Sequence, residues 1–332
     1  MAAADVALFI PFRDDMLHPW LDDVVRPLEG RCTVEVYDTS LPFEAQVASV
    51  FAVVDQGGWG TREMLDAAAE AGISLWQVLG TGLDHFDLEY ALDRGFPVAN
   101  TPGRYSSVGL AEHALLLMLC FAKCIDTSRA NARSGMFYKP ITDDLEDRTL
   151  LVVGFGASGR ELARRAHACG MRLLAVDELE IDEASSGEYG LVDSGGPEDL
   201  DRLLPEADYV SLHVPLTHGT RRLLDRRRLD LLKPEAVIVN VARGGLVDEP
   251  SLVEALTNGR LRGAGLDVFA HEPLLPDDPL LALDNVIATP HIAGGTQGTS
   301  RRRGQAVAEN LVRALEGRPI LDRITSAEAL AG

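Results

Sequence analysis

Up to about residue 100, short apolar runs alternate with segments in which apolar residues recur at the spacing of a helix. The runs predict strands and the intervening segments predict helices, because one face repeats every two residues in a strand and about every 3.6 in a helix. Strands are predicted at 6–12, 33–38, 52–56, 74–80 and 97–101, and helices at 16–29, 43–50, 61–72 and 87–95. Such alternation indicates a parallel sheet covered by helices.

A second series of the same kind begins near residue 148, with strands predicted at 148–156, 171–177, 207–214, 235–242, 263–269 and 285–290. Between the two series, residues 106–133 predict one long helix that Ser106 or Ser107 caps. The helical segment 304–317 follows the last strand and is expected to return to the first unit. We therefore expect two α/β domains, one formed by residues 1–101 with 296–332 and the other by residues 102–295.

The first strand of the second series leads into Gly154, Gly156 and Gly159, then into an amphipathic helix and a second strand that ends at Asp177. The first glycine permits a tight turn, the second lets backbone approach a pyrophosphate, and the third lets the helix lie close to the strand. Free N–H groups at the helix N-terminus suit the pyrophosphate, and Asp177 is placed to accept hydrogen bonds from a ribose diol. Because Glu178 follows and no basic residue stands close behind, the pattern favours NAD over NADP. The alternative is a structural glycine turn followed by a surface aspartate.

The stretch "TPHIAGG" places His291 just past an apolar run, behind a proline and ahead of small residues that leave its ring uncovered. Taken alone, such a histidine is a loop residue whose hydrogen bonds are satisfied locally. Only its neighbours elsewhere in the chain give a reason to assign it chemistry.

Six segments carry a resemblance to one family. "LGTGLDHFDLEYA", "GFGASG", "HVPLT", "VNVARGGLVDE", "GAGLDVFAHEP" and "ATPHIAGG" occur in this order, and together they resemble the D-isomer-specific 2-hydroxyacid dehydrogenases over roughly residues 75–320. The resemblance implies a Rossmann NAD-binding domain inserted in a flavodoxin-like substrate domain, both doubly wound parallel sheets. It also implies interconversion of a 2-oxo acid and a D-2-hydroxy acid, and a homodimer formed through the helix at 106–133.

The resemblance assigns Arg243, Glu272 and His291 as the catalytic set. Reducing a 2-oxo acid needs a cation for its carboxylate, which the fork of Arg243 suits, and a proton donor for its carbonyl oxygen, which His291 suits. Glu272, paired with the other ring nitrogen, would fix the tautomer and raise the pKa of the histidine. Without the family, Arg243 could be a surface residue, Glu272 could cap a loop, and His271 could be the working histidine.

The resemblance also implies the residues that hold the cofactor and the substrate. The expected cofactor contacts are Gly154, Gly156, Ala157, Ser158, Gly159, Asp177, Arg243, His291 and Gly294, with Thr81, Val214, Val241, Ala242 and Asp267 lining the nicotinamide. Asp267 would accept a hydrogen bond from the carboxamide. The expected substrate contacts are Gly57, Gly82, Leu83, Arg243 and His291, with the backbone around Gly82 and Leu83 holding the substrate carboxylate. His213 is expected to be structural, and no metal site is expected.

Three segments depart from the family pattern. Residues 56–60, "QGGWG", stand where the phosphoglycerate dehydrogenases have arginine and serine in the first substrate loop. Arg62 is expected to face solvent, so we predict an unphosphorylated 2-oxo acid such as glyoxylate, hydroxypyruvate or an acid with an apolar tail resting on Trp59. Ser158, in place of a usual isoleucine, and "GMFYKP" at 135–140, in place of a pattern with tryptophan, are expected to affect packing only. Glu272 argues against the formate dehydrogenases, which carry glutamine there.

Composition narrows the class of partner. A net charge of -20 repels nucleic acid and anionic lipid, so neither is an expected partner, and the arginine-rich stretch 221–232 is interpreted as a solvated helix face. The longest apolar run, residues 114–122, is much shorter than the ~20 residues that a membrane helix needs, and the N-terminus lacks the pattern of a secretory signal. The four cysteines form no CxxC pair, so reduced thiols and a cytoplasmic location are expected.

Two other functions share these features. The C-terminal-binding-protein corepressors resemble the same dehydrogenases, keep NAD and the catalytic set, and act mainly by docking partners. Phosphite oxidation is a second activity on the same fold. Turnover with a panel of 2-oxo acids, and oxidation of phosphite with NAD, distinguish these functions from the predicted one.

Overall fold

The computed structural model describes residues 5–28, 30–83 and 85–326. The ends of the first expected domain, the last residue of the helix predicted at 16–29, and Asp84 in the first quoted motif lie outside this part of the chain. The chain divides into two compact units, unit 1 formed by residues 1–105 with 296–332, and unit 2 by residues 106–295. The first division falls four residues later than the sequence suggested, and the second falls at the expected place.

Unit 1 is built on a six-stranded sheet in the order β13-β5-β4-β3-β1-β2. Its strands are β1 (Val6–Ile10), β2 (Thr33–Val36), β3 (Ala52–Asp55), β4 (Leu75–Val78), β5 (Val98–Ala99) and β13 (Arg323–Ile324). β1 to β5 pair in parallel, and β13 adds an antiparallel edge strand. The order of the parallel strands is that of a flavodoxin-like doubly wound sheet. The five strands predicted here are confirmed.

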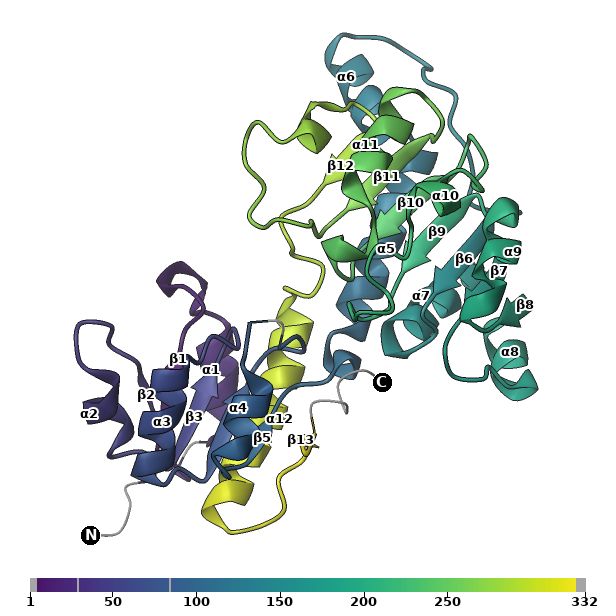
Figure 1. Cartoon of the computed structure of the whole chain (residues 1–332). Helices are drawn as coiled ribbons and strands as arrows, with labels where there is room; N and C mark the ends of the chain where they lie inside the picture. Colours follow the sequence, from purple (N-terminus) through teal and green to yellow (C-terminus); the bar gives the residue numbers. More distant parts are fainter. Residues whose placement is uncertain (1–4, 29, 84, 327–332) are drawn as a thin grey trace. The chain divides into compact units, whose positions relative to one another are not determined.

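Helices cover both faces of the unit 1 sheet, with one apolar core cluster on each side. They are α1 (Trp20–Val25), α2 (Phe43–Val47), α3 (Arg62–Ala71), α4 (Leu88–Asp93) and α12 (Gln297–Leu315), with short 3-10 turns η1 (Asp14–Met16), η2 (Arg26–Leu28) and η3 (Gly103–Tyr105). The last helix, α12, lies against α1 in unit 1 although it comes late in the chain, as the sequence predicted (Figure 1). It begins seven residues before the predicted start, where Thr296 caps its N-terminus.

Unit 2 is built on a seven-stranded sheet in the order β12-β11-β10-β9-β6-β7-β8. Its strands are β6 (Thr149–Val153), β7 (Arg172–Val176), β8 (Leu191–Gly195), β9 (Tyr209–Leu212), β10 (Val237–Asn240), β11 (Gly263–Leu266) and β12 (Val286–Ala288), all paired in parallel. Six follow the order of a Rossmann sheet, with the order reversing between β6 and β9. The predicted fold class, two α/β units on doubly wound sheets, is confirmed.

The helices of unit 2 are α5 (Ser107–Ala122), α6 (Ile125–Arg133), α7 (Ala157–Ala168), α8 (Glu183–Tyr189), α9 (Leu200–Leu203), α10 (Arg226–Leu229) and α11 (Glu249–Thr257). Four 3-10 turns join them, η4 (Pro197–Asp199), η5 (Leu204–Glu206), η6 (Gly244–Leu246) and η7 (Pro279–Ala282). α5 lies directly on the sheet, because a Cβ on Gly265 of β11 would stand 2.9 Å from the Cβ of Leu117. The two glycines of β11 therefore allow a close helix on this face.

The single helix predicted at 106–133 is wrong, since α5 and α6 are two helices bent by 56°. Cys124 at the break has a left-handed backbone with φ of 45°. The last carbonyls of α5 bind groups from other segments, because Phe121 O accepts from Arg262 Nη2 at 3.1 Å and Ala122 O accepts from Asp143 N at 2.8 Å. These distant partners end the helix at a place where the sequence has neither glycine nor proline.

Strands β8 and β13 were not predicted, since neither carries a run of apolar residues. The arginine-rich stretch 221–232 contains only the four-residue α10, whose Arg226 pairs with Glu254 of α11. All four cysteines are free. In the described part of the chain no single helix is long and apolar enough to cross a membrane, whereas α5 and α6 meet that length and composition only as a bent pair.

Candidate functional site

Six loops of unit 2 follow the carboxyl ends of neighbouring parallel strands and so lie along one edge of its sheet. Each of these loops begins with a residue or a short segment that the sequence singled out. They are Gly154 after β6, Asp177 after β7, His213 after β9, Arg243 after β10, Asp267 after β11 and the segment with His291 after β12. This edge is where open α/β sheets bind ligands.

The three glycines of the motif differ in what surrounds them. Gly154 has φ of 97°, and a Cβ there would stand 2.7 Å from the carbonyl carbon of His213. A Cβ on Gly159 would stand 2.0 Å from the carbonyl oxygen of Gly154, so α7 lies close to the turn. A Cβ on Gly156 would meet no atom within 4 Å, and the residue stands at the N-cap of α7. Open space beside the first free N–H groups of a 12-residue helix fits a pyrophosphate.

Asp177 holds the same loop from the end of β7. One carboxylate oxygen accepts from the N–H of Phe155 in the glycine turn, and the other accepts from the N–H of Leu179 at 2.9 Å. Each carboxylate oxygen has a second lone pair, so these bonds leave acceptor capacity for a ribose diol. The geometry fits NAD at this end of the site.

Ser158 does more than fill space, which corrects the expectation of a packing effect only. Its hydroxyl lies 3.0 Å from His213 Nδ1, and the other ring nitrogen of His213 lies 2.9 Å from the hydroxyl of Ser211. Desolvation lowers the pKa of His213 to about 4. A neutral imidazole between two hydroxyls donates to one and accepts from the other, so it orients Ser158 at the N-terminus of α7.

Arg243 follows β10 at the start of η6, in a partly buried position. Its guanidinium Nη1 donates to Ala242 O at 2.8 Å, and its own carbonyl accepts from Asn240 Nδ2 at 2.8 Å. The next residue, Gly244, packs against the loop after β11, since a Cβ there would stand 1.8 Å from the carbonyl carbon of Phe269. Gly244 thus lets this loop pack against the segment that carries Glu272.

Glu272 and His291 form a direct pair, with Oε2 and Nδ1 separated by 2.7 Å. The second carboxylate oxygen accepts from the N–H of Phe269 at 2.9 Å, which fixes the orientation of the carboxylate. Partial burial acts to raise the pKa of Glu272, but hydrogen bonds from His291 and Phe269 and the positive charges of His291 and Arg243 outweigh it, so the pKa lies below its ordinary value. Arg243, Glu272 and His291 therefore form one charged cluster, while His271 is exposed beside it.

Asp267 anchors the loop that carries His291, a role that the sequence did not suggest. Its buried carboxylate accepts from the hydroxyl of Thr289 at 2.6 Å and from the N–H groups of Ile292 at 2.9 Å and Ala293 at 2.8 Å. Its carbonyl accepts from the N–H of His291 at 2.8 Å. His291 has φ of 55°, a strained conformation that such surroundings can hold.

Four of the predicted site residues belong to unit 1 and follow β3 or β4. Gly57 lies in the loop after β3, and Thr81, Gly82 and Leu83 lie in the loop after β4. The two loops touch, because a Cβ on Gly58 would stand 3.7 Å from both Gly82 O and Leu83 Cδ2.

Two arginines of unit 1 lie near the loops after β3 and β4. Arg62 pairs with Asp87 and lies over the ring of Tyr90 at 4.7 Å, with 64% of its side chain exposed, which agrees with the expected solvent-facing position. Arg303 of α12, at a position where no sequence motif indicates a site residue, donates from Nη2 to the hydroxyl of Thr81 at 2.9 Å.

The remaining predicted contacts lie close to these elements. Val214 borders the glycine turn, since its Cγ1 would stand 2.8 Å from a Cβ on Gly154. Val241 and Ala242 are buried directly after β10, Ala157 is the first residue of α7, and Gly294 lies near Leu110 of α5. The segment at 135–140 was expected to matter for packing, but Phe137 and Tyr138 are each 87% exposed.

One family model matches a part of the chain that lies within unit 2. A family model described as the NAD binding domain of D-isomer specific 2-hydroxyacid dehydrogenases matches residues 115–293. The D-3-phosphoglycerate dehydrogenase of Methanocaldococcus jannaschii is 38% identical over 312 residues, which are 91% of this chain and 57% of that protein. The hydroxypyruvate reductase of Thermotoga maritima is 40% identical over 242 residues, which are 71% of this chain and 76% of that protein.

Solved structures share the whole architecture. The TT0316 protein of Thermus thermophilus is 35% identical with a TM-score of 0.79, and the alignment covers 96% of this chain and 99% of that one. The D-lactate dehydrogenase of Lactobacillus jensenii, solved with NAD⁺, is 27% identical with a TM-score of 0.81 and coverage of 97% and 99%.

Proposed function

The chain belongs to the D-isomer-specific 2-hydroxyacid dehydrogenase family, and from this premise we propose that it interconverts a 2-oxo acid and a D-2-hydroxy acid. Residues 115–293 contain the NAD-binding domain of that family, so the family and the cofactor expected from the sequence are confirmed. The observation that carries the proposed reaction is the 2.7 Å pair of Glu272 and His291 in one cluster with Arg243.

In the proposed reduction, Arg243 binds the carboxylate of the 2-oxo acid and His291 gives a proton to its carbonyl oxygen. Because Nδ1 is held by the carboxylate of Glu272, Nε2 is the nitrogen that exchanges the proton. Glu272 also stabilises the charged imidazolium, and the N–H of Phe269 keeps the carboxylate in place. In the reverse direction, neutral His291 removes the proton of the alcohol.

The cofactor supplies or accepts the hydride when it is bound. Gly154, Gly156 and Gly159 with the N-terminus of α7 would hold its pyrophosphate, and Asp177 would hold the adenosine ribose. Ser158, which His213 orients, adds a hydroxyl at the same helix end. The residues present at this edge of the sheet therefore fit NAD.

We propose that the substrate is not phosphorylated. Phosphate recognition normally uses several charge-assisted donors, each contributing on the order of 1.5–3 kcal/mol. The loop at 56–60 supplies no charged side chain, and Arg62 beside it is engaged by Asp87 and exposed. Glyoxylate and hydroxypyruvate are therefore expected to have higher kcat/KM than 3-phosphohydroxypyruvate.

The experiment is NADH oxidation across a panel of 2-oxo acids, run alongside phosphite with NAD. Reduction of the unphosphorylated acids is the expected result. A preference for 3-phosphohydroxypyruvate would overturn the substrate class and leave the reaction intact. NADH formation from phosphite would identify the rival activity, and NADH binding without turnover of any acid would favour a partner-docking protein.

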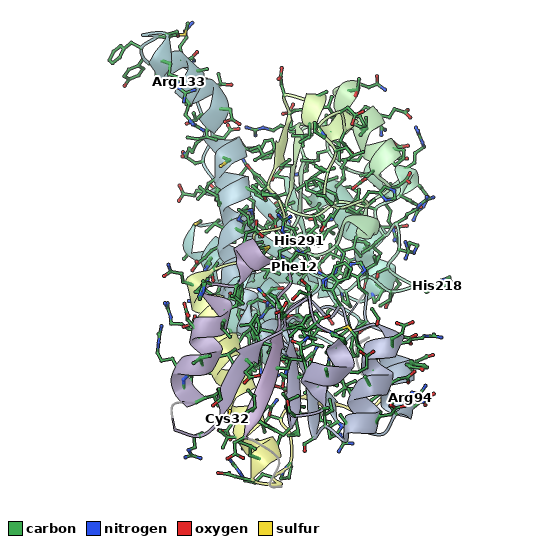
Figure 2. The ribbon with its side chains drawn as sticks, turned by 90° about the vertical axis from the view of Figure 1, so that its left-hand side faces the viewer. Phe12, Cys32, Arg94, Arg133, His218 and His291 are labelled. Atoms are coloured by element: carbon green, nitrogen blue, oxygen red, sulfur yellow. The ribbon has the colours of Figure 1, made fainter. Side chains whose placement is uncertain are left out.

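A second copy of the chain is the partner we propose. Large apolar side chains gather, exposed, on α5, on α6 and on the segment after them: Leu116, Leu119, Ile125, Met136, Phe137, Tyr138 and Ile141. Figure 2 shows Arg133, the last residue of α6, at the tip of a helix that projects outward. Exposed large apolar side chains gathered on neighbouring segments are typical of an interface. Sedimentation should find a dimer, and Phe137→Glu should give a monomer; a wild-type monomer at micromolar concentration would contradict this.

We also propose a cytoplasmic location, which the four free cysteines support. Fractionation of the source cells with an antibody to the chain would test it.

A further inference from the structure

Three exposed aromatic side chains meet at the carboxyl edge of the unit 1 sheet. Phe12 follows β1, Trp59 follows β3 and His85 follows β4, three neighbouring parallel strands. The rings of Trp59 and His85 stack with centroids 4.4 Å apart, and those of Phe12 and Trp59 lie 5.7 Å apart. Phe12 is 42% exposed and Trp59 47%; Figure 2 shows Phe12 in its loop. These three residues are called the aromatic cluster below.

A buried carboxylate holds the loop that carries Trp59. Asp55, at the end of β3, is fully buried, and its Oδ1 accepts from the N–H groups of Gly57 at 3.2 Å, Gly58 at 2.8 Å and Trp59 at 3.1 Å. Its Oδ2 accepts from the N–H of Gly60 at 3.0 Å. Four consecutive amides bound to one carboxylate fix the course of this loop.

The neighbouring side chains complete the support. Gln56 accepts from the N–H of Phe12 at 3.0 Å and donates to the carbonyl of Met16 at 3.1 Å, so the loop after β1 is tied to the loop after β3. Gly57 leaves room for the indole, because a Cβ there would stand 2.1 Å from Trp59 Cδ1 and 2.7 Å from Phe12 Cδ2. The aromatic cluster is thus held in place while its rings stay open to solvent.

Exposed aromatic rings on loops that hydrogen bonds hold in place are typical of a binding surface. The cluster adjoins the loop proposed to hold the substrate carboxylate, since Gly58 lies against Gly82 O and Leu83 Cδ2. We propose that the aromatic cluster receives the side chain of the 2-oxo acid, and that it selects acids with an aromatic side chain over those with none. This inference rests on the proposed function, whose substrate class it narrows.

The test compares kcat/KM for phenylpyruvate and glyoxylate, with NADH, in the wild type and in Trp59→Ala. Aromatic contacts of this kind contribute enough for a change of about three- to tenfold. We expect the wild type to prefer phenylpyruvate, and Trp59→Ala to lose about tenfold for phenylpyruvate while glyoxylate changes less than twofold. Trp59→Phe should restore most of the preference. Val192→Ala, which removes an exposed apolar side chain from β8 of unit 2, should change kcat/KM for neither substrate.

Binding gives a second readout that does not depend on turnover. With NAD present, phenylpyruvate cannot be reduced, because both the acid and the cofactor are in their oxidised forms; its binding should change the intrinsic fluorescence of the wild type, and this change should be largely lost in Trp59→Phe. If Trp59→Ala fails to fold, Trp59→Leu takes its place, since it keeps an apolar side chain of moderate size but removes the ring.

The outcomes separate this inference from the function on which it rests. If the wild type reduces glyoxylate at least as well as phenylpyruvate, or if Trp59→Ala lowers both substrates equally, the role of the aromatic cluster is overturned and the proposed reaction stands. If no 2-oxo acid is reduced, the proposed function fails and the inference fails with it.

Discussion

Replacing Asp267 by asparagine should disable the site without removing any group that reacts. The buried carboxylate receives three donors from the loop that carries His291, namely the hydroxyl of Thr289 and the N–H groups of Ile292 and Ala293. The amide oxygen of an asparagine can still accept from the hydroxyl of Thr289 and the N–H of Ile292, which share one carboxylate oxygen of Asp267. Its NH₂ group then faces the third N–H, so that one buried donor is left without an acceptor.

The loss of stability in Asp267→Asn can be estimated from these contacts. An unsatisfied buried donor costs about 1–3 kcal/mol, and the remaining hydrogen bonds lose the assistance of a charge that roughly doubles their strength. We expect Asp267→Asn to destabilise the loop by about 2–4 kcal/mol. Because His291 depends on this loop for its left-handed backbone, and a misplacement of about 1 Å can lower a rate by about a hundredfold, kcat should fall by about ten- to a hundredfold.

The assay is kcat with NADH and glyoxylate, measured beside a thermal unfolding curve. Thr289→Val, which removes one donor and keeps the charge of Asp267, should give an intermediate loss, and Thr289→Ser, which keeps the hydroxyl, should remain near wild type. A folded Asp267→Asn with kcat within threefold of wild type would refute the anchoring role. Loss of NADH affinity at unchanged kcat would instead favour contact with the nicotinamide carboxamide.

Three further predictions concern the cofactor end of unit 2. Asp177→Ser should lower the preference for NAD over NADP in kcat/KM by about tenfold or more, because a charge-assisted acceptor worth on the order of 1.5–3 kcal/mol is lost; an unchanged ratio would mean that another residue binds the ribose. Gly154→Ala should lower the thermal unfolding midpoint by several degrees, because Gly154 has φ of 97° and an added Cβ would meet the carbonyl of His213. Gly156→Ala adds a Cβ in open space, so it should keep the midpoint and weaken only NADH binding. Equal midpoints for the two variants would contradict the different roles of these glycines in the turn. The pKa of His213 is lowered from 6.5 to about 4, so as the pH falls the unfolded state takes up a proton before the folded state does. The free energy of unfolding should therefore decrease as the pH is lowered from 6.5 to about 4, by at most about 3 kcal/mol. His213→Asn should remove this part of the pH dependence, and identical pH profiles for the variant and the wild type would contradict the buried, neutral state of His213.

Local patterns were enough to predict the strands, because each buried parallel strand is a compact apolar run such as residues 237–240. They were not enough to assign Arg243, Glu272 and His291 to one site, which required the resemblance to the family; the shared edge at the carboxyl ends of parallel strands is consistent with that assignment. The strands β8 and β13 lie at sheet edges, where partial exposure leaves no continuous apolar run to detect.

What the sequence could not predict depends on contacts between distant segments. Ser158 and His213 are 55 positions apart and meet only because β6 and β9 are neighbours in the sheet. The break between α5 and α6 depends on Arg262, which binds a carbonyl more than a hundred residues away in the chain. The anchoring role of Asp267 required the path of a loop that composition and spacing leave open.

The variant His291→Asn decides whether His291 exchanges the proton of the reaction. Asparagine tolerates the left-handed backbone observed at this position, so the substitution removes the imidazole and spares the loop. We expect NADH binding close to wild type and a kcat with glyoxylate lowered by about 10²–10⁴, the range of general acid–base catalysis. A kcat within a few-fold of wild type would contradict it, and loss of NADH binding would make the role of His291 structural.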